Sequence, residues 1–550
     1  MSIARSVPAL LAALLVAAAA GAGSPGGGAI SEAGYRATIA TLASDAFEGR
    51  KPGQPGEPRT LDYLEAEFRA AGLAPGVAGS YRQDVPLVEI TAAPDAALEV
   101  AGDRGSARFA YGEDMAVWTK RVVPESGLAA SPLVFVGHGI VAPEYGWNDY
   151  AGMDMHGKTA VILINDPGYR DPALFRGRKM TYYGRWTYKY EEAMRQGAAG
   201  ALIVHQTGPA AYGWEVVRNS NTGPLLEADA ADGHAGRVAI EGWITLEAAR
   251  RLCALAGEDL DALERAATRP GFRPVPLAAR ATVAVRNTIR RTRSANVVGV
   301  LPGARRPNEY LVYMAHWDHF GRASQPVPGS DPIFHGAVDN ASGVAGILEI
   351  AKAFSHARRP PDRSVVFLAL TGEESGLLGS AYYGANPVFP LAATAAAINI
   401  DALLPVGRTR DLEVIGYGAS ELEDLLKEEA ARQGRVLRPD SQPEKGFYFR
   451  SDHFNLAKRG VPALYIESGI DSRDHPPGWV EAQVQDYIAH RYHKPADTYD
   501  PSWNVAGNLE DLALLYAVGR RVADGTRWPA WYPGSEFSAA RAASRAPASR

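Results

Sequence analysis

The sequence of 550 residues contains only one cysteine, Cys253. A single thiol cannot form an intramolecular disulfide, so the fold has to be stabilised by burial of apolar side chains, helped by any bound metal. The formal net charge is only −5 at pH 7. This charge gives no electrostatic basis for binding nucleic acid or an anionic membrane surface, and we expect neither as a partner. Two hydrolase motifs are also absent from the sequence, the H-E-x-x-H metal motif and the G-x-S-x-G nucleophile elbow.

The N-terminus has the pattern of a cleavable secretory signal. Arg5 gives a short positive start, residues 9–20 form an apolar run, and small residues follow at 21–24. The run is shorter than the roughly 20 residues that a membrane-spanning helix needs, and an uncleaved anchor is the alternative. No cysteine lies near the cleavage region, which excludes lipid attachment there. We therefore predict that residues 1–23 are removed and that the chain is exported to the periplasm or the medium, without stable membrane insertion.

Changes in the hydrophobic pattern divide the remaining chain into four parts. Residues 24–120 begin with helical periodicity and are predicted to be the N-terminal part of the main domain. Residues 121–285 contain short apolar runs of strand length and no cluster of ligand-type side chains, which indicates a β-rich inserted domain. From 286 to 532 strands alternate with helices, which predicts an α/β fold with a mixed, mostly parallel sheet and flanking helices. Residues 533–550 are rich in Ala, Ser and Arg and are predicted to be disordered.

Side chains that suit metal binding follow the predicted strands of the main domain. Eight of the twelve histidines lie at or beyond His316, so this domain is the place to look for ligand chemistry. In open α/β sheets, functional groups gather at the carboxyl ends of the strands. Three groups of polar residues follow predicted strands in this way, and one precedes the helix predicted at 341–354. In chain order the candidates are His316 with Asp318, Asp339, Glu373 with Glu374, and Asp401.

Each of these residues, taken alone, has an ordinary structural explanation. Asp339 before a helix is more often an N-terminal cap than a ligand, and a single Asp after a strand is usually a turn residue. Glu373 and Glu374 would usually form part of a solvated surface. Their repeated occurrence at the same end of one predicted sheet favours metal binding over these ordinary roles, because independent turn residues have no reason to converge. With His493 added, two imidazoles and three carboxylates suit a pair of divalent metal ions that share one carboxylate.

This composition predicts a specific chemistry. Two metal ions about 3.5 to 4 Å apart can share a hydroxide, lower its pKa, and stabilise both the attacking and the leaving oxygen. A further carboxylate has to carry the proton of the water to the leaving amine, and Glu373, next to Glu374, is placed for that role. Asp318, two residues after His316, is expected to hold a ligand imidazole in the required tautomer. The residues therefore predict attack of a metal-activated water on an amide-like bond.

The order of these residues resembles that of the M28 family of zinc peptidases. The stretch 48–53 resembles the N-terminal segment of that family, and 135–158 resembles its inserted protease-associated (PA) domain. The resemblance implies a PA-like domain at 121–285 and a peptidase domain formed by 24–120 and 286–532. The segments that match the catalytic motifs are His316-x-Asp318, residues 336–343, residues 372–380, Asn399-x-Asp401 and Tyr492-His493.

The resemblance also implies a ligand set for two zinc ions. His316 and Asp401 would bind one ion, and Glu374 and His493 would bind the other. Asp339 would bridge the two ions.

For the residues around the ligands, the resemblance implies other roles. Glu373 would be the general base and acid, and Asp318 the orienting carboxylate. His319 and His335 depart from the usual pattern, and we expect them beside the ligands or at the rim of the substrate site, because the ligand count is already complete. One further loop matches a loop that lies near the substrate pocket in relatives, and a structural role for it is equally open. Its candidates for substrate binding are Arg450, Asp452 and His453.

The function predicted from the sequence is that of a zinc-dependent exopeptidase, an aminopeptidase that removes N-terminal residues from peptides. The first alternative is a carboxypeptidase of the glutamate-releasing type, which needs cationic side chains for its substrate, and Lys445 and Arg450 are available for this. The second alternative is a non-catalytic, receptor-like ectodomain. That alternative predicts loss of ligands, whereas all five ligand candidates and Glu373 are present. The sequence does not indicate an oligomeric state.

Overall fold

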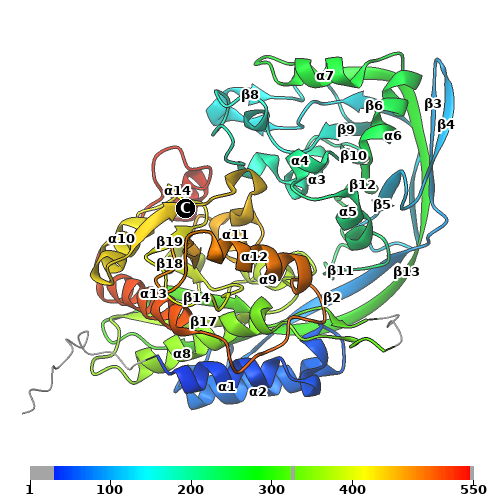
Figure 1. The fold of residues 1–550 in the computed structure, drawn as a ribbon. Helices are drawn as coiled ribbons and strands as arrows, with labels where there is room; N and C mark the ends of the chain where they lie inside the picture. Colours follow the sequence, from blue (N-terminus) through cyan, green and yellow to red (C-terminus); the bar gives the residue numbers. More distant parts are fainter. Residues whose placement is uncertain (1–29, 324–328, 546–550) are drawn as a thin grey trace, which may run out of the picture.

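The computed structural model describes residues 30–323 and 329–545 of the chain. The predicted signal, residues 1–23, lies outside the described residues. Among the helices of the described part, none is both long and apolar enough to cross a membrane. The described chain consists of two regions, each built on a β-sheet (Figure 1).

The main sheet has a parallel centre with antiparallel strands at its edges. Its four central strands, in spatial order, are β17 (Arg363–Leu370), β14 (Arg306–His316), β18 (Thr394–Asn399) and β21 (Ala463–Ser468). β13 (Val275–Leu301) and β2 (Arg82–Ala92) extend the sheet on one side, and β19 (Asp411–Val414) extends it on the other. Every residue of β17 is buried, as expected for a parallel strand covered on both faces. The predicted α/β fold with a mixed, mostly parallel sheet is confirmed.

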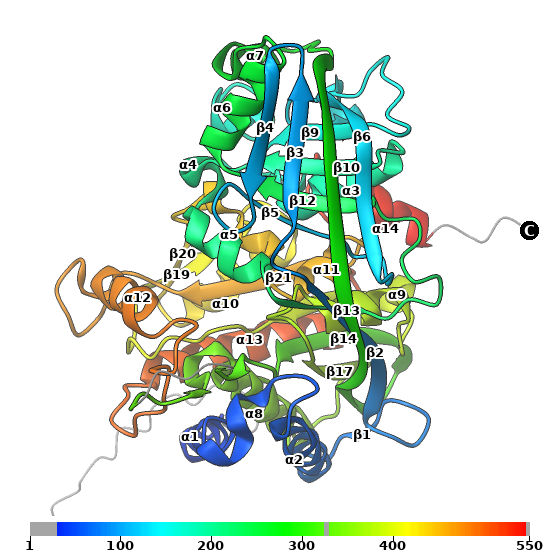
Figure 2. The same cartoon turned by 90° about the vertical axis from the view of Figure 1, so that its right-hand side faces the viewer.

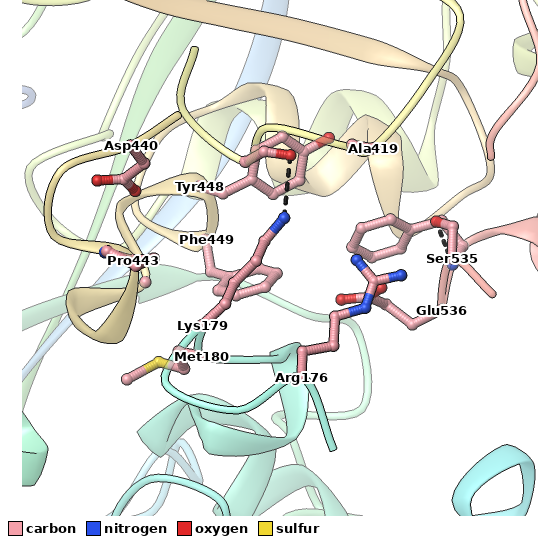
Figure 3. Close-up of a pocket in the computed structure, with 13 residues that line it drawn as sticks. Arg176, Lys179, Met180, Ala419, Asp440, Pro443, Tyr448, Phe449, Ser535 and Glu536 are labelled. Carbon is pink, nitrogen blue, oxygen red and sulfur yellow. Dashed lines mark hydrogen bonds between the residues drawn. The ribbon is translucent and has the colours of Figure 1, made fainter. Parts of the chain in front are cut away.

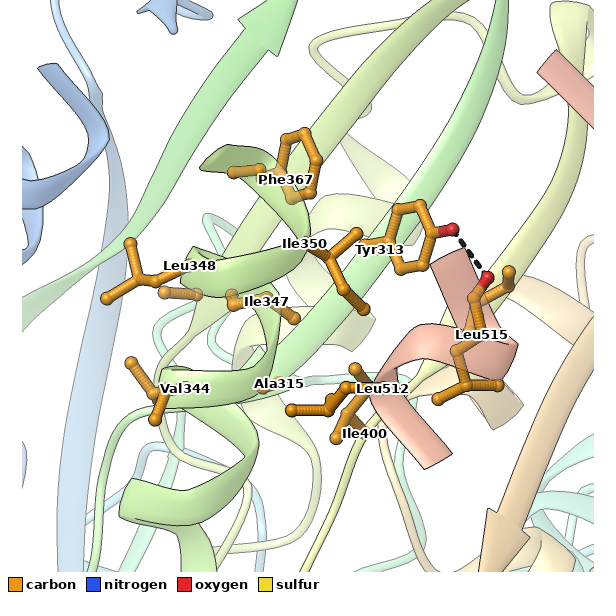
Figure 4. Close-up of a cluster of buried hydrophobic side chains, with 14 of the residues drawn as sticks. Tyr313, Ala315, Val344, Ile347, Leu348, Ile350, Phe367, Ile400, Leu512 and Leu515 are labelled. Atoms are coloured by element: carbon orange, nitrogen blue, oxygen red, sulfur yellow. Dashed lines mark hydrogen bonds between the residues drawn. The ribbon is translucent and has the colours of Figure 1, made fainter. Parts of the chain in front are cut away.

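Helices cover both faces of the main sheet. Alternate strand residues point to opposite sides, so each face presents apolar side chains against which helices pack. Tyr313 and Phe367 pack under α8 (Gly343–Ser355) and α13 (Ala506–Asp524), as Figure 4 shows. The Tyr313 hydroxyl donates a hydrogen bond to the carbonyl of Leu515 in α13, at 2.8 Å. Two further helices, α1 (Glu32–Leu42) and α2 (Gly56–Ala70), pack against α8 on this side.

The opposite face of the main sheet has its own apolar cluster. Val312 and Leu368, the neighbours of Tyr313 and Phe367, point to this side. They pack with side chains of α9 (Leu378–Ala385) and α11 (His453–Ala457), among them Tyr383 and Leu456. The sheet is therefore the middle of three layers, and its strand ends are the only parts of the central strands that reach polar loops.

The second region is a smaller sheet joined to the first by one long strand. β13 is 27 residues long, and its first half pairs with β3 (Ala97–Gly102) and β6 (Glu125–Phe135) before its second half enters the main sheet (Figure 2). We call residues 97–285 the second-sheet region. The remaining strands of this sheet are β4 (Gly105–Ala110), β5 (Met115–Trp118), β9 (Thr159–Leu163), β10 (Gly200–Val204) and β12 (Ile240–Ile244).

Two sequence-based boundaries differ from this arrangement. Residues 97–118 were assigned to the main domain, but they pair with strands of the second sheet, because their hydrogen-bonding partners lie far along the chain in β12 and β13. The segment predicted to be disordered from 533 is ordered through residue 545 and ends in α14 (Ser538–Arg545). The buried ring of Phe537 anchors this segment, and Arg541 donates to the carbonyl oxygens of Leu391 and Thr394.

The second-sheet region docks on the main domain through residues 416–458. Lys179 donates to the carbonyl oxygens of Gly416 (3.2 Å) and Tyr417 (2.6 Å). Glu191 forms an ion pair with Lys458 at 2.9 Å. Side chains of both regions and of the C-terminal segment, among them Glu536, line a small cavity at this junction (Figure 3). Among the described residues, those that line this cavity include none of the predicted site residues.

The core beneath the sheet edge should be sensitive to truncation. Leu512 of α13 fits against Gly346 of α8, where even an added Cβ would meet Leu512 Cδ2 at 2.7 Å. We expect Leu512→Ala to lower the free energy of unfolding by about 2 to 5 kcal/mol, because it removes buried methyl groups and leaves a cavity. The half-exposed Ile488→Ala in α12 (Trp479–His490) serves as control and should change it by only about 0.5 kcal/mol. Urea unfolding of both variants measures this, and equal effects would contradict the assigned packing.

Candidate metal centre

The predicted ligands meet at the carboxyl edge of the main sheet. His316 is the last residue of β14, and it lies opposite Leu370, the last residue of β17. Glu374 follows Leu370 closely, and Asp401 follows the end of β18. Parallel strands bring their carboxyl ends to one edge, which is why residues far apart in the sequence converge here. Ligand atoms of His316, Asp339 and Glu374 all lie within 4.8 Å of one another.

The five residues form two ligand groups that share Asp339. The Nε2 atom of His316 lies 3.1 Å from Asp401 Oδ1 and 3.2 Å from Asp339 Oδ1. The Nε2 atom of His493 lies 3.1 Å from Asp339 Oδ2 and 3.3 Å from Glu374 Oε2. The two oxygens of Asp339 thus face different imidazoles. Each group offers one nitrogen and two carboxylate oxygens, the donor set that zinc prefers.

The electrostatics of the cluster also fit bound cations. Burial acts to lower the pKa of His316, but Asp401 and Glu373 outweigh it and raise that pKa well above its ordinary value. In His493 the same competition raises the pKa to about 9, through Glu374 and Asp339. The imidazoles are thus held in a field that favours positive charge. Divalent cations between these groups would supply that charge directly, so the residues present fit a pair of metal ions.

The imidazole of His316 is oriented by the backbone and not by the predicted carboxylate. His316 Nδ1 lies 3.1 Å from the backbone oxygen of Asp318, whereas the Asp318 carboxylate is 3.8 Å away and too distant for a hydrogen bond. Oδ1 of that carboxylate instead accepts a hydrogen bond from the backbone N–H of Glu373, at 3.0 Å. Asp318 therefore fixes the loop that places Glu373, and its peptide oxygen takes the role expected of its side chain.

Asp497 holds the loop that contains Asp339, a role that the sequence analysis missed. Its carboxylate accepts hydrogen bonds from the backbone N–H groups of Val338 (3.1 Å) and Asp339 (3.1 Å). The hydroxyl of Tyr487 donates to the same group at 3.2 Å. Asp497 is almost fully buried, so it positions Asp339 without access to solvent. Its place four residues after His493 was the only signal in the sequence.

Arg50 fixes the same loops from the other side. Its buried guanidinium donates to the backbone oxygens of Trp317 (2.9 Å), His335 (2.7 Å) and Gly336 (2.9 Å). Burial lowers the pKa of Arg50 to about 10, while carboxylates of the cluster act in the opposite direction. One cation thus connects the loop after β14 with the loop before α8. The stretch 48–53 was noted for its family resemblance, but its sequence alone did not indicate this contact.

Comparisons with known proteins agree with this geometry. Residues 296–517 match the sequence profile of Peptidase family M28. This segment is therefore similar to peptidases of that family. Its matching range includes both ligand groups, Glu373 and the parallel strands that present them.

Curated relatives match limited parts of the chain, whereas a solved structure aligns over most of it. The chain is 33% identical over 140 residues to an Aminopeptidase NAALADL1 from Mus musculus, covering 24% of this chain and 17% of that protein. It is 28% identical over 207 residues to a Glutamate carboxypeptidase 2 homolog from Caenorhabditis elegans, covering 36% and 24%. The chain thus spans at most about a quarter of these relatives. The structure of an aminopeptidase from Aneurinibacillus sp. strain AM-1 aligns over 92% of this chain and 95% of that one, with 20% identity and a TM-score of 0.49.

Two further histidines in the segment that matches the family, His319 and His335, differ in their placement. His319 Nδ1 lies 2.6 Å from Glu374 Oε1, on the oxygen that does not face His493. Burial lowers the pKa of His319 to about 3, so the ring is neutral and can orient Glu374. His335 lies apart from the cluster, because its ring contacts the backbone oxygen of Ala43 and the carboxylate of Asp331, both at 2.8 Å.

The loop after residue 449 reaches the cluster through a residue that was not a candidate. Ser451 donates to Asp401 Oδ2 at 2.6 Å and accepts from Asn399 Nδ2 at 2.7 Å. Asp452 and His453 are fully buried, and burial raises the pKa of Asp452 to about 7 and lowers that of His453 to about 3. Within the described residues, neither side chain has a hydrogen-bond partner for its terminal atoms.

A phosphate-loop pattern elsewhere in the chain does not form a nucleotide site. Residues 152–159 match G-x-x-x-x-G-K-T, but such a loop must lie between a strand and the N-terminus of a helix. Here Thr159 begins strand β9, and Lys158 donates to the backbone oxygen of Asp154. The pattern therefore lacks the structural context that phosphate binding requires.

Asp497 provides a test of how the site is positioned. We expect Asp497→Ala to lower zinc affinity about 10- to 100-fold, because the loop that carries Asp339 loses the acceptor of two buried N–H groups. Competition with a chromophoric chelator measures this affinity. The control is Asp500→Ala, which removes an exposed carboxylate that bonds only to nearby Ser502 and should leave zinc affinity unchanged. Equal affinities of both variants and the unaltered protein would show that Asp497 does not position Asp339.

Proposed function

We propose that this chain is a zinc-dependent exopeptidase, an aminopeptidase that removes N-terminal residues from peptides. The observation that supports it most is the Asp339 carboxylate, whose two oxygens face two separate groups of ligand atoms, with Glu373 beside them. In this proposal His316 and Asp401 hold one zinc ion, His493 and Glu374 hold the other, and Asp339 bridges them. When bound, the ions would lower the pKa of a shared water and stabilise negative charge on the scissile carbonyl oxygen.

Glu373 is proposed to move the proton. It takes a proton from the attacking water and delivers it to the leaving amine nitrogen. Burial raises the pKa of Glu373 well above its ordinary value, and the carboxylates of Glu374 and Asp401 add to this. A raised pKa makes a carboxylate a stronger base toward the attacking water, and the proton that it takes up is then available for the leaving amine. The hydrogen bond from the Glu373 backbone N–H to Asp318 holds it in place.

The proposal also states that residues are removed from the N-terminus of the peptide and not from its C-terminus. Relatives with both printed activities match the chain, an aminopeptidase and a glutamate carboxypeptidase homolog. A direct test compares an aminoacyl nitroanilide with an N-blocked acidic dipeptide as substrates. Turnover of the first alone supports the aminopeptidase, and turnover of the second alone supports the carboxypeptidase. The retained ligands and Glu373 favour either enzyme over a receptor-like ectodomain.

We further propose that the protein acts outside the cytoplasm and that residues 121–285 form a PA-like domain. The export proposal rests on the N-terminal pattern of residues 1–23. N-terminal sequencing of the mature protein from cell fractions tests it, and retention of residue 1 in the cytosol would contradict it.

Glu373→Gln separates metal binding from proton transfer. The change keeps size and polarity but removes the base, so we expect the zinc content to stay near normal while kcat falls by a factor on the order of 10² to 10⁴. Zinc analysis and steady-state kinetics on the same preparation measure both quantities. If Glu373→Gln lost zinc and activity together, Glu373 would be a ligand and its proposed role would be wrong.

Metal removal tests the ion count. We expect the purified protein to contain two zinc ions per chain and dialysis against a strong chelator to abolish peptide hydrolysis, with recovery on adding zinc. His316→Ala and His493→Ala each remove one imidazole from a different ligand group, so each should lower the zinc content. His335→Ala is the control histidine, because its ring contacts Ala43 and Asp331 instead. Chelator-resistant hydrolysis would contradict the proposal.

A further inference from the structure

Glu374 presents only one of its two carboxylate oxygens to its ligand group. Its Oε2 lies 3.3 Å from His493 Nε2, where the two residues face each other. Its Oε1 lies 2.6 Å from Nδ1 of His319, a distance typical of a strong hydrogen bond to a carboxylate. The second oxygen of this candidate ligand is therefore already engaged by a side chain of the protein itself.

The surroundings of His319 allow its ring to act in only one way. The side chain is buried, and its Nε2 atom has no hydrogen-bond partner among the described residues. A proton on Nδ1 completes the hydrogen bond to Glu374, whereas a proton on Nε2 would be a buried donor without an acceptor. The contacts therefore favour a neutral ring whose single N–H group points at Glu374 Oε1.

A glycine on the neighbouring loop makes room for this ring. Gly336 has a φ of 57°, and a Cβ atom at this position would lie 2.7 Å from His319 Cγ. It would also lie 2.7 Å from Nη2 of Arg50, which donates to the backbone oxygen of Gly336. The ring of His319 thus packs directly on the loop that carries Asp339. Any larger residue at position 336 would displace it.

Asp401, the terminal carboxylate of the other ligand group, is arranged in a similar way. Its Oδ1 lies 3.1 Å from His316 Nε2, while its Oδ2 accepts a hydrogen bond from the Ser451 hydroxyl at 2.6 Å. Of the three carboxylates, only Asp339 presents both of its oxygens to imidazoles. Each ligand group therefore has a terminal carboxylate with one oxygen for a metal ion and one oxygen bonded to the protein.

The number of ligand oxygens influences which divalent ion such a group prefers. Zinc is usually four-coordinate, so one oxygen from each carboxylate is enough and a position remains for water. Manganese and calcium take more oxygen ligands, and calcium often binds both oxygens of one carboxylate. A hydrogen bond that withholds Oε1 of Glu374 from the ion therefore favours zinc over these ions.

We propose that His319 restricts Glu374 to one metal-binding oxygen and thereby makes this ligand group selective for zinc over manganese. The inference rests on the proposed function, which needs a metal ion held by His493 and Glu374. In this proposal His319 is a positioning residue, because it acts through Glu374 and touches neither the ion nor the substrate. Its Nδ1–H group carries the effect, and its Nε2 atom takes no part.

Three variants of His319 differ in where they place a donor. His319→Asn places an amide nitrogen near the position of Nδ1, His319→Gln places one near that of Nε2, and His319→Leu has no donor. We expect His319→Gln and His319→Leu to lower the ratio of zinc affinity to manganese affinity about 10- to 100-fold, because Oε1 becomes free to bind the ion. His319→Asn should keep the ratio near that of the unaltered protein.

Competition with a chromophoric chelator, with each metal in turn, measures this ratio. Asn and Gln carry the same functional group, so their comparison does not depend on whether His319→Leu folds. A ratio that His319→Gln preserves and His319→Asn lowers would assign the effect to Nε2 and overturn the proposal. An equal loss of zinc and manganese affinity in all three variants would show that His319 only supports the fold, which would also overturn it.

Cobalt(II) in place of zinc reports the coordination number directly. Its visible absorption is stronger at four- or five-coordinate sites than at six-coordinate sites. We expect this absorption to weaken in His319→Leu and to persist in His319→Asn, and an unchanged spectrum in both would contradict the proposal. The control is His138→Leu, which removes a buried histidine of the second-sheet region whose Nδ1 contacts the backbone oxygen of Asn165 at 3.0 Å. It should change neither the affinity ratio nor the spectrum.

These measurements do not depend on turnover, so the inference and the proposed function fail separately. If the affinity ratio falls as expected in His319→Leu but the unaltered protein hydrolyses no peptide, the proposed function fails and the role of His319 stands. If peptides are hydrolysed and all three variants keep the ratio of the unaltered protein, only the role of His319 fails.

Discussion

The Asp339 carboxylate has to stay between two imidazoles, and much of the main domain is arranged around this constraint. Each of its oxygens lies within 3.2 Å of a different histidine Nε2 atom. Arg50 holds the backbone before it, and Asp497 accepts the N–H of Asp339 itself. Because these hydrogen bonds are buried, no water replaces a lost partner, and each loss costs the full desolvation of the group that remains. The position of Asp339 is therefore set by hydrogen bonds to the backbone of its loop.

The convergence of several buried carboxylates at this sheet edge creates an excess of negative charge. Burial raises the pKa values of Glu373 and Glu374 well above the ordinary range, and repulsion by neighbouring carboxylates adds to it. Arg50, a buried cation close to the cluster, donates its N–H groups to four backbone oxygens. Among the described residues it bonds to no carboxylate of the cluster. Divalent ions would balance the cluster, so metal binding and stability of the sheet edge are coupled in this site.

Local patterns in the sequence were enough for the central strands and for the candidate ligands that follow them, which the structure brings together, because a strand end and the residue after it are neighbours in the chain. The groups that hold the ligands were not predictable in the same way. Asp497 and Arg50 act through backbone atoms of distant loops, and a contact with a backbone atom leaves no mark on the sequence of its partner. The composition of the tail predicted disorder, but the buried ring of Phe537 and the hydrogen bonds of Arg541 hold it in place through residue 545. The assignment of residues 97–118 failed because strand pairing is non-local.

The way in which the second-sheet region is attached to the main domain limits how far it can move. β13 continues without a break from one sheet to the other, and β2 pairs with it over eleven residues on the main-sheet side. Lys179 and Glu191 attach the opposite side of the region to residues 416–458. Within the same region, β11 (Pro224–Ala228) also pairs with β2. A body held at several separated places has little freedom to swing as a lid. The second-sheet region is therefore expected to keep its place on the main sheet throughout a turnover, so that any residue it contributes to substrate binding acts without a closing step.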